Sequence, residues 1–202
     1  LEDIAKEHDG RIVLFVEAGD FIHPPRALAG IHGMAGDAPI QKDVRDCFVL
    51  SGLRTPTQDL RFLMDELVEI ALRALSPGIN DPGTAIDVIG TLVRLFTLWQ
   101  SPLEKNRLQA LCYNRVSVPE LVTDDMFDDA FTVIARDGAG MAEVAIRLQK
   151  AFCALAETND QAMGAAARNH SRMALTRSEL AMGLQEDINA VRRAAEFSAD
   201  GN

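Results

Sequence analysis

The strongest constraint on the fold is the stretch ALRALSPGINDPGTA, residues 71–85, which separates two segments of helical periodicity. Pro77 disfavours helical geometry at the residue before it, so the first helix is predicted to end there. Gly78 is predicted to take a left-handed turn conformation. Asp81 followed by Pro82 is a typical helix start, because aspartate caps free N–H groups and proline is tolerated in the first turn. The chain is therefore predicted to contain two helices joined by a tight turn.

Helical periodicity extends well beyond this turn. In the segment before it, TQDLRFLMDELVEIALRAL, apolar residues follow the i, i+3, i+4 rule. In the segment after it, Asp87 and Arg94 are the only charges between Ala85 and Trp99, which predicts a central, largely buried helix. Further helices are predicted at about 102–113, 120–136 and 140–157, and residues 161–195 are predicted to form one long helix or a kinked pair.

The first quarter of the chain has a different pattern. RIVLFV (11–16), ALAGI (27–31) and RDCFVLSG (45–52) are short apolar runs separated by turn residues, and they predict three strands. The predicted fold class is α+β, mostly α, with a small β-rich unit over residues 1–55 followed by a multi-helix bundle over residues 56–202.

The turn GDFIHPPRAL resembles the hairpin of lipoyl and biotinyl barrel-sandwich domains, in which a second glycine precedes leucine. Pro25 stands where that glycine is expected. Lys42 is the only nearby lysine, and it lacks the flanking residues needed for attachment of a prosthetic group. Barrel-sandwich-like hairpins remain an alternative for the β unit, but no cofactor is predicted.

Charge and cysteine usage limit the function classes. The net charge is −10, and the twenty basic residues are scattered among thirty acidic ones, which argues against a nucleic-acid surface. Cys47, Cys112 and Cys153 lie in apolar sequence and are predicted to be buried, reduced thiols. Reduced thiols favour the cytoplasm.

No pattern in the sequence supports a catalytic or metal-binding site. Four carboxylates in TDDMFDDAF are explained by the preference of acidic residues for the positive end of a helix dipole. The four histidines are isolated from one another, and the chain has no nucleophile elbow, P-loop or dinucleotide fingerprint. No catalytic residue and no metal site is predicted.

The turn at residues 76–84 remains the best candidate for a ligand or partner site. Asn80 and Thr84 have no evident role in forming the turn, and the free N–H groups of the helix start could bind an anion or a polar group. Asp81 would oppose an anion. The candidate site residues are Arg54, Gln58, Arg73, Ser76, Asn80, Asp81 and Thr84.

One longer stretch carries a family resemblance. RTPTQDLRFLMDELVEIALRALSPGINDPGTAIDVIGTL, with Gly19-Asp20-Phe21 upstream, resembles the soluble C-terminal region of bacterial predicted membrane proteins of domain-of-unknown-function family 2254. The resemblance is most specific over Arg54-Thr55, Gln58-Asp59 and IALRALSPGINDPGTA. It implies an upstream membrane-spanning region as partner and an inner-membrane location, and it supplies no chemistry.

Two hypotheses follow from these observations. The first is a non-enzymatic cytoplasmic domain of an inner-membrane protein that serves assembly or regulation of the membrane part. A long helix containing Met163, Met173 and Met182 suggests core or dimer packing, and hence a homo-oligomer. The second is a small-ligand sensor or enzyme with a pocket between the β unit and SPGINDP.

Overall fold

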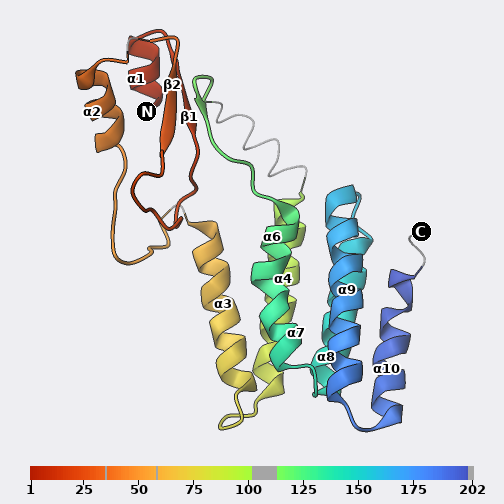
Figure 1. Ribbon diagram of the computed structural model, residues 1–202. Helices are drawn as coiled ribbons and strands as arrows, with labels where there is room; N and C mark the ends of the chain where they lie inside the picture. The colour runs from red at the N-terminus through yellow and green to blue at the C-terminus, as the bar shows by residue number, and fades with distance from the viewer. Residues whose placement is uncertain (35, 58, 102–112, 200–202) are drawn as a thin grey trace. The chain divides into compact units, whose positions relative to one another are not determined.

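A computed structural model describes residues 1–34, 36–57, 59–101 and 113–199 of the chain (Figure 1). The described residues are mostly helical, with a small sheet of three strands, which confirms the predicted α+β, mostly α class. They fall into two compact units: Leu1–Phe62 with Asn106–Glu120, and Leu63–Lys105 with Leu121–Asn202. The predicted division into domains at residues 1–55 and 56–202 stays a prediction.

The first unit is built on a sheet with the strand order β2-β1-β3. β1 (Arg11–Leu14) pairs antiparallel with β2 (Ala29–His32), and these two strands confirm the predicted runs at 11–16 and 27–31. β1 also pairs in parallel with β3 (Val116–Ser117). Two helices, α1 (Glu2–Glu7) and α2 (Ala38–Asp46), contribute Ala5, Ile40 and Val44 to a core centred on Ile12.

The prediction of a strand at residues 45–52 is wrong. The end of α2 occupies the first two of these positions, and the rest are irregular. Asp37 caps α2 by accepting a 3.2 Å hydrogen bond from the Ile40 N–H, and Ile40 and Val44, four residues apart, are its buried residues. Lys42 lies in α2 and forms an ion pair with Asp46, so it is not on a hairpin turn.

The second unit is a bundle of helices. Its elements are α3 (Leu60–Leu75, whose first residues belong to the first unit), α4 (Pro82–Trp99), α6 (Thr123–Phe127), η1 (a π-helix, Asp128–Thr132), α7 (Val133–Asp137), α8 (Ala142–Ala156), α9 (Gln161–Ala181), α10 (Gln185–Ala195) and η2 (a 3₁₀ helix, Glu196–Ser198). The segment 161–195 is therefore a pair of helices, interrupted at residues 182–184. The helix predicted at about 102–113 lies almost entirely outside the described residues.

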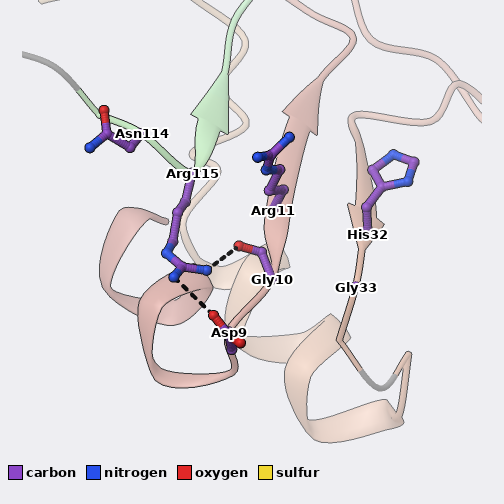
Figure 2. Close-up of a pocket in the computed structure, with 7 residues that line it drawn as sticks. All are labelled: Asp9, Gly10, Arg11, His32, Gly33, Asn114 and Arg115. Carbon is purple, nitrogen blue, oxygen red and sulfur yellow. Dashed lines mark hydrogen bonds and ion pairs between the residues drawn. The ribbon is translucent and has the colours of Figure 1, made fainter.

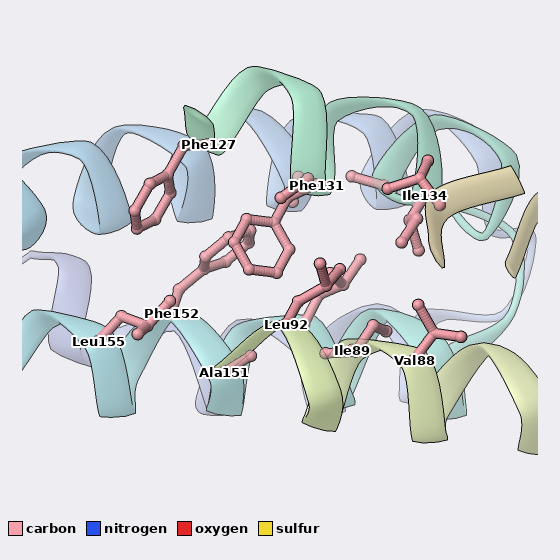
Figure 3. Packing of buried hydrophobic residues seen from close by; sticks show 14 of the residues in the cluster. Val88, Ile89, Leu92, Phe127, Phe131, Ile134, Ala151, Phe152 and Leu155 are labelled. Atoms are coloured by element: carbon pink, nitrogen blue, oxygen red, sulfur yellow. The ribbon is translucent and has the colours of Figure 1, made fainter. Parts of the chain in front are cut away.

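Aromatic side chains form the centre of this bundle (Figure 3). Phe127 immediately precedes the π-helical segment, Phe131 lies within it, and both are fully buried. The ring centroid of Phe131 lies 5.4 Å from that of Phe127 and 5.2 Å from that of Phe152. The ring centroid of Phe96 of α4 lies 4.8 Å from that of Phe127, so residues distant in sequence pack in one cluster.

Two predictions about burial need correction. The predicted largely buried helix α4 buries one face, from Ala85 to Phe96, whereas Leu98 on its other side is 58% exposed. Among the cysteines, Cys47 is exposed and Cys153 is half-buried, because Cys47 falls at the C-terminal cap of α2 rather than in a strand. Cys112 lies outside the described residues. Among the helices that the structure describes, none has the length and apolar character needed to span a bilayer.

Candidate functional site

The turn between α3 and α4 is closed by hydrogen bonds within the chain. The Asn80 N–H donates to the Ser76 carbonyl at 2.9 Å, and the Asp81 N–H donates to the Ala74 carbonyl at 2.8 Å. The Ser76 hydroxyl donates to the Arg73 carbonyl at 2.7 Å. These bonds use polar atoms that a ligand would otherwise contact.

Asp81 caps α4 as predicted, and Thr84 completes the cap. The Thr84 N–H donates to Asp81 Oδ1 at 3.2 Å, and the Thr84 hydroxyl donates to Asp81 Oδ2 at 2.6 Å. The side-chain and backbone hydrogen bonds from Thr84 hold the pKa of Asp81 below its usual value. Thr84, which has no evident turn role in the sequence, therefore has one in the structure.

The left-handed position of the turn is Asn80, so the prediction for Gly78 is wrong. Asn80 has φ 51°, whereas Gly78 is not among the residues with positive φ. Asparagine tolerates this region better than other side chains, because its short amide can bond locally. Each of the polar turn residues thus has a structural role, which strengthens the interpretation of this stretch as a turn.

An open cleft of about 420 Å³ lies beside the turn. Its charged lining comes from Glu66, Glu69 and Arg73 of α3 and from the capping residue Asp81. Arg73 is exposed, and its side chain has no ion-pair partner among the residues that the structure describes. The structure therefore brings Arg73, Asp81 and Thr84 of the predicted site to one cleft. Arg54 lies elsewhere, beside the residue that precedes α3, and Gln58 lies outside the described residues.

Arg54 is part of a second candidate site at the start of α3. Its Nε donates to Asp59 Oδ2 at 2.8 Å and its Nη2 donates to Asp59 Oδ1 at 2.9 Å, which is a bidentate pair. The Phe62 N–H also donates to Asp59 Oδ1, at 2.8 Å, so Asp59 caps α3. Asp59 is only 3% exposed, and the Arg54 guanidinium also lies over the Phe62 ring, 5.3 Å from its centroid.

The electrostatics of Asp59 favour its charged form. Burial raises the pKa of this carboxyl, but the hydrogen bonds from Arg54 and the Phe62 N–H, together with the charges of Arg54 and Arg61, outweigh burial and lower it. The pair is therefore ionised at neutral pH and is a fixed structural element rather than a proton donor.

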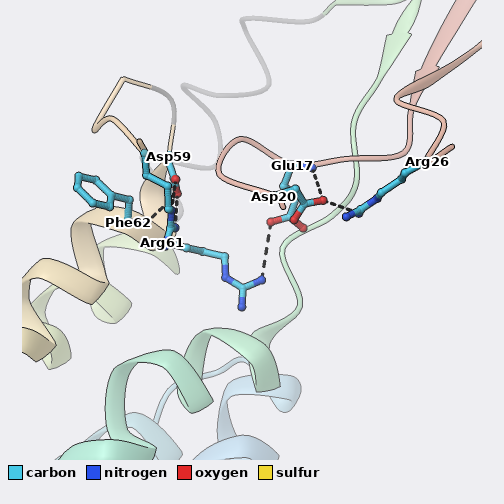
Figure 4. A network of polar contacts seen from close by, with 7 residues as sticks. Glu17, Asp20, Arg26, Asp59, Arg61 and Phe62 are labelled. Atoms are coloured by element: carbon cyan, nitrogen blue, oxygen red, sulfur yellow. Dashed lines mark hydrogen bonds and ion pairs between the residues drawn. The ribbon is translucent and has the colours of Figure 1, made fainter. Parts of the chain in front are cut away.

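The loop at residues 17–26 packs onto this pair through Gly19. Figure 4 shows Glu17, Asp20 and Arg26 of this loop together with Asp59 and Phe62. Gly19 has φ 91°, and a Cβ at this position would overlap Asp59 Oδ2 and lie 2.9 Å from Arg54 Nε. Only glycine fits there without displacing the pair. Within the same loop, Asp20 Oδ2 accepts hydrogen bonds from the Glu17 N–H at 3.2 Å and from Arg26 at 2.7 Å.

Four large apolar side chains are exposed in the two loop segments that this contact joins. We call them the apolar loop surface: Phe21 (81% exposed), Val49 (91%), Leu50 (68%) and Leu53 (81%). Phe21 is two residues from Gly19, and Leu53 is adjacent to Arg54. The Arg54–Asp59 pair thus joins two segments that are distant in sequence and that both carry exposed apolar side chains.

Two polar contacts in the bundle have no clear signal in the sequence. Gln149 of α8 donates to the Ser171 carbonyl of α9 at 3.1 Å and accepts from the Ser171 hydroxyl, and both residues are fully buried. His170 packs beside the rings of Phe127 and Phe152, with its Nε2 3.7 Å from an Asp128 carboxylate oxygen. In the described part of the chain, no three His, Cys, Asp or Glu side chains form a group that could hold a metal ion.

Comparisons with known proteins identify a family and no activity. The model of a family described as "Predicted membrane protein (DUF2254)" matches residues 1–154. Uncharacterized proteins of Mycobacterium tuberculosis and Mycobacterium bovis are 61% identical to the chain over 36 residues. That stretch covers 18% of this chain and 7% of each relative. No solved structure matches the chain significantly.

Proposed function

The chain belongs to the DUF2254 family of predicted membrane proteins, and from this we propose that it serves assembly of such a protein through contacts between copies. In this proposal the chain is a non-enzymatic part outside the bilayer, on the cytoplasmic side. The observation that carries the proposal is the apolar loop surface, whose four large side chains are exposed in loops fixed by the Arg54–Asp59 pair.

Physical reasons support an interface at this surface. Single exposed apolar residues are ordinary, but several in adjoining loop segments are typical of surfaces that bind other proteins. Burying one such side chain contributes roughly 1.5–3 kcal/mol. The loops are anchored by the bidentate pair of Arg54 with the buried Asp59 and by Gly19, so less conformational entropy is lost on association.

The apolar loop surface is a better candidate for self-association than the apolar face of α9. Met163, Ala166, Ala167 and Ala174 of α9 are buried in the bundle core, so most of that face is already covered. The apolar loop surface, by contrast, has no covering element among the described residues. A second copy of the chain is the proposed occupant, because symmetric dimers are the commonest assemblies of soluble domains.

The test compares two double variants of the full-length protein in detergent. Leu50→Asp with Leu53→Asp is expected to convert the oligomer to a monomer in size-exclusion chromatography with light scattering. Leu180→Asp with Leu184→Asp is the matched control, since these leucines are also exposed but lie in the bundle. A wild-type monomer, or equal dissociation of both double variants, would contradict the proposal.

The second candidate function is a small-ligand sensor or enzyme at the cleft beside the α3–α4 turn. Arg73 favours it, because this guanidinium lines the cleft without a partner among the described residues. The internal bonding of Ser76, Asp81 and Thr84 weighs against it. Arg73→Gln tests it by complementation of a deletion strain: lost function with unchanged oligomer and thermal stability would favour the ligand site over assembly.

A further inference from the structure

A row of basic side chains crosses one end of the small sheet. Arg11 on β1 is the registered partner of His32 on β2, and Ile12 is the registered partner of Val116 on β3. Arg115 therefore lies beside Arg11 in the same register, and all three side chains lie on the face opposite Ile12, which is fully buried. The order across the sheet is His32, Arg11, Arg115.

This arrangement is unfavourable for the sheet alone. Directly opposed cross-strand side chains have Cβ atoms about 4.5–5.5 Å apart, and like charges at that separation destabilise the pairing. Arg115 is compensated, because its Nη2 lies 2.9 Å from an Asp9 carboxylate oxygen and its Nη1 donates to the Gly10 carbonyl at 3.2 Å. Arg11 is exposed and forms no ion pair or side-chain hydrogen bond with any residue that the structure describes.

The row borders an open cleft of about 490 Å³ (Figure 2). The backbone at Gly10 approaches the neighbouring strand so closely that a Cβ there would overlap Met34 and lie 2.8 Å from the His32 carbonyl. Gly33, at φ 75°, makes the turn out of β2. Gly10 and Gly33 line the cleft together with the basic groups, and the Asn114 side chain adds an amide to its rim.

We propose that this cleft binds a phosphate group through Arg11, Arg115 and His32. Guanidinium groups bind phosphate with paired, charge-assisted hydrogen bonds, and a bound phosphate would relieve the repulsion between Arg11 and Arg115. Asp9 already pairs with Arg115, which holds that guanidinium in place, whereas Arg11 has no ion-pair partner among the residues that the structure describes. The phosphate comes either from a small soluble molecule or from a lipid headgroup.

Binding is tested on the full 202-residue chain with two probes. Calorimetry and amide chemical shifts measure the binding of inorganic phosphate to the chain. Cosedimentation measures the binding of the chain to phosphatidylcholine vesicles with and without phosphatidic acid. Saturable binding is expected, with shift changes at Gly10 and His32. Binding of phosphate in solution indicates a soluble ligand, whereas binding of phosphatidic acid vesicles alone indicates a headgroup.

Two substitutions that remove the same charge at different positions distinguish a specific phosphate site from general attraction of anions to basic residues. Arg11→Gln is expected to weaken binding about 10-fold or more, since a charge-assisted hydrogen bond is lost. Arg147→Gln removes the same charge from an exposed position on α8 and should change binding less than 2-fold. His32→Gln provides a second variant at the cleft if Arg11→Gln does not fold, and a several-fold weakening is expected.

Three results would overturn the proposal. The first is no saturable binding of either probe. The second is an equal effect of Arg11→Gln and Arg147→Gln. The third is vesicle binding that persists unchanged in Arg11→Gln and His32→Gln. The residues differ from those of the proposed assembly surface, so either proposal can fail without the other.

Discussion

Asn80 illustrates how a single backbone angle changes the interpretation of a residue. From the sequence it has no evident part in the turn and would serve as a contact for a ligand or partner. In the structure its φ of 51° makes it the left-handed residue that lets the chain turn from α3 into α4. A residue with this φ has a conformational role, whether or not anything binds to it.

Alanine and glycine at position 80 should therefore affect stability differently. Asn80→Ala is expected to cost about 1 kcal/mol, because alanine tolerates the left-handed region poorly, and to lower the melting temperature by roughly 2–4 °C. Asn80→Gly should be neutral or slightly stabilising. Thermal unfolding of both variants measures this, and an equal loss in both would show that the amide's contacts, not the angle, matter.

The residues of the turn also show what sequence reasoning can decide. The cap at Asp81 was predictable, since Asp-Pro before an apolar helix has one common use. The choice between Gly78 and Asn80 for the left-handed position was not, because both residue types adopt it and the two are close together. Partners distant in sequence, such as Gly19 and Asp59, are set by tertiary packing and leave no local pattern.

Among the elements, long periodic helices were predictable and the shorter pieces of structure less so. α3, α4 and α8 follow from apolar spacing over fifteen residues or more. β3 has two residues, too few for any periodicity, and it pairs with a strand a hundred positions earlier. At residues 38–46 the helical pattern of Ile40 and Val44 competes with the β-prone run that follows, and the cap at Asp37 favours the helix.

The buried pair between α8 and α9 should behave as a unit. Ser171→Ala removes a donor to the buried Gln149 side chain and is expected to cost about 1–3 kcal/mol, because the amide oxygen loses its partner. Adding Gln149→Met should recover much of this loss, since both polar groups are then gone. Urea unfolding of the two single variants and the double variant measures the coupling. Strictly additive losses would contradict a direct interaction.

At the scale of the whole molecule, one buried histidine makes stability depend on pH. Burial lowers the pKa of His170 below 6.5, and nearby Arg177 lowers it further, while the Asp128 and Asp124 carboxylates partly oppose this shift. The unfolded chain therefore binds a proton at a higher pH than the folded chain. The stability that neutral His170 contributes is complete above about pH 6.5 and is lost as pH falls toward the folded-state pKa.

This dependence can be isolated by substitution. The free energy of unfolding of the wild-type chain should decrease from pH 7.5 to pH 5.5, and His170→Gln should reduce that decrease because the substituted side chain does not titrate. Denaturant unfolding at the two pH values provides the comparison. The pKa of Asp59 is lowered, so its contribution to folding stability is lost only at more acidic pH and does not affect the comparison between pH 7.5 and pH 5.5. Parallel pH profiles for the two proteins would assign the dependence to other groups.

The exposed thiol at the end of α2 makes the orientation of the chain in a cell directly measurable. Cys47 is open to solvent, whereas Cys153 is half-buried, and burial and the nearby Glu157 raise its pKa, which slows its reaction. In a full-length protein carrying Cys112→Ser, a membrane-impermeant maleimide should therefore modify Cys47 before Cys153. Labelling only after the cells are opened would agree with the proposed cytoplasmic side, and labelling of intact cells would reverse it. One side chain at a helix end thus serves as a reporter of membrane topology.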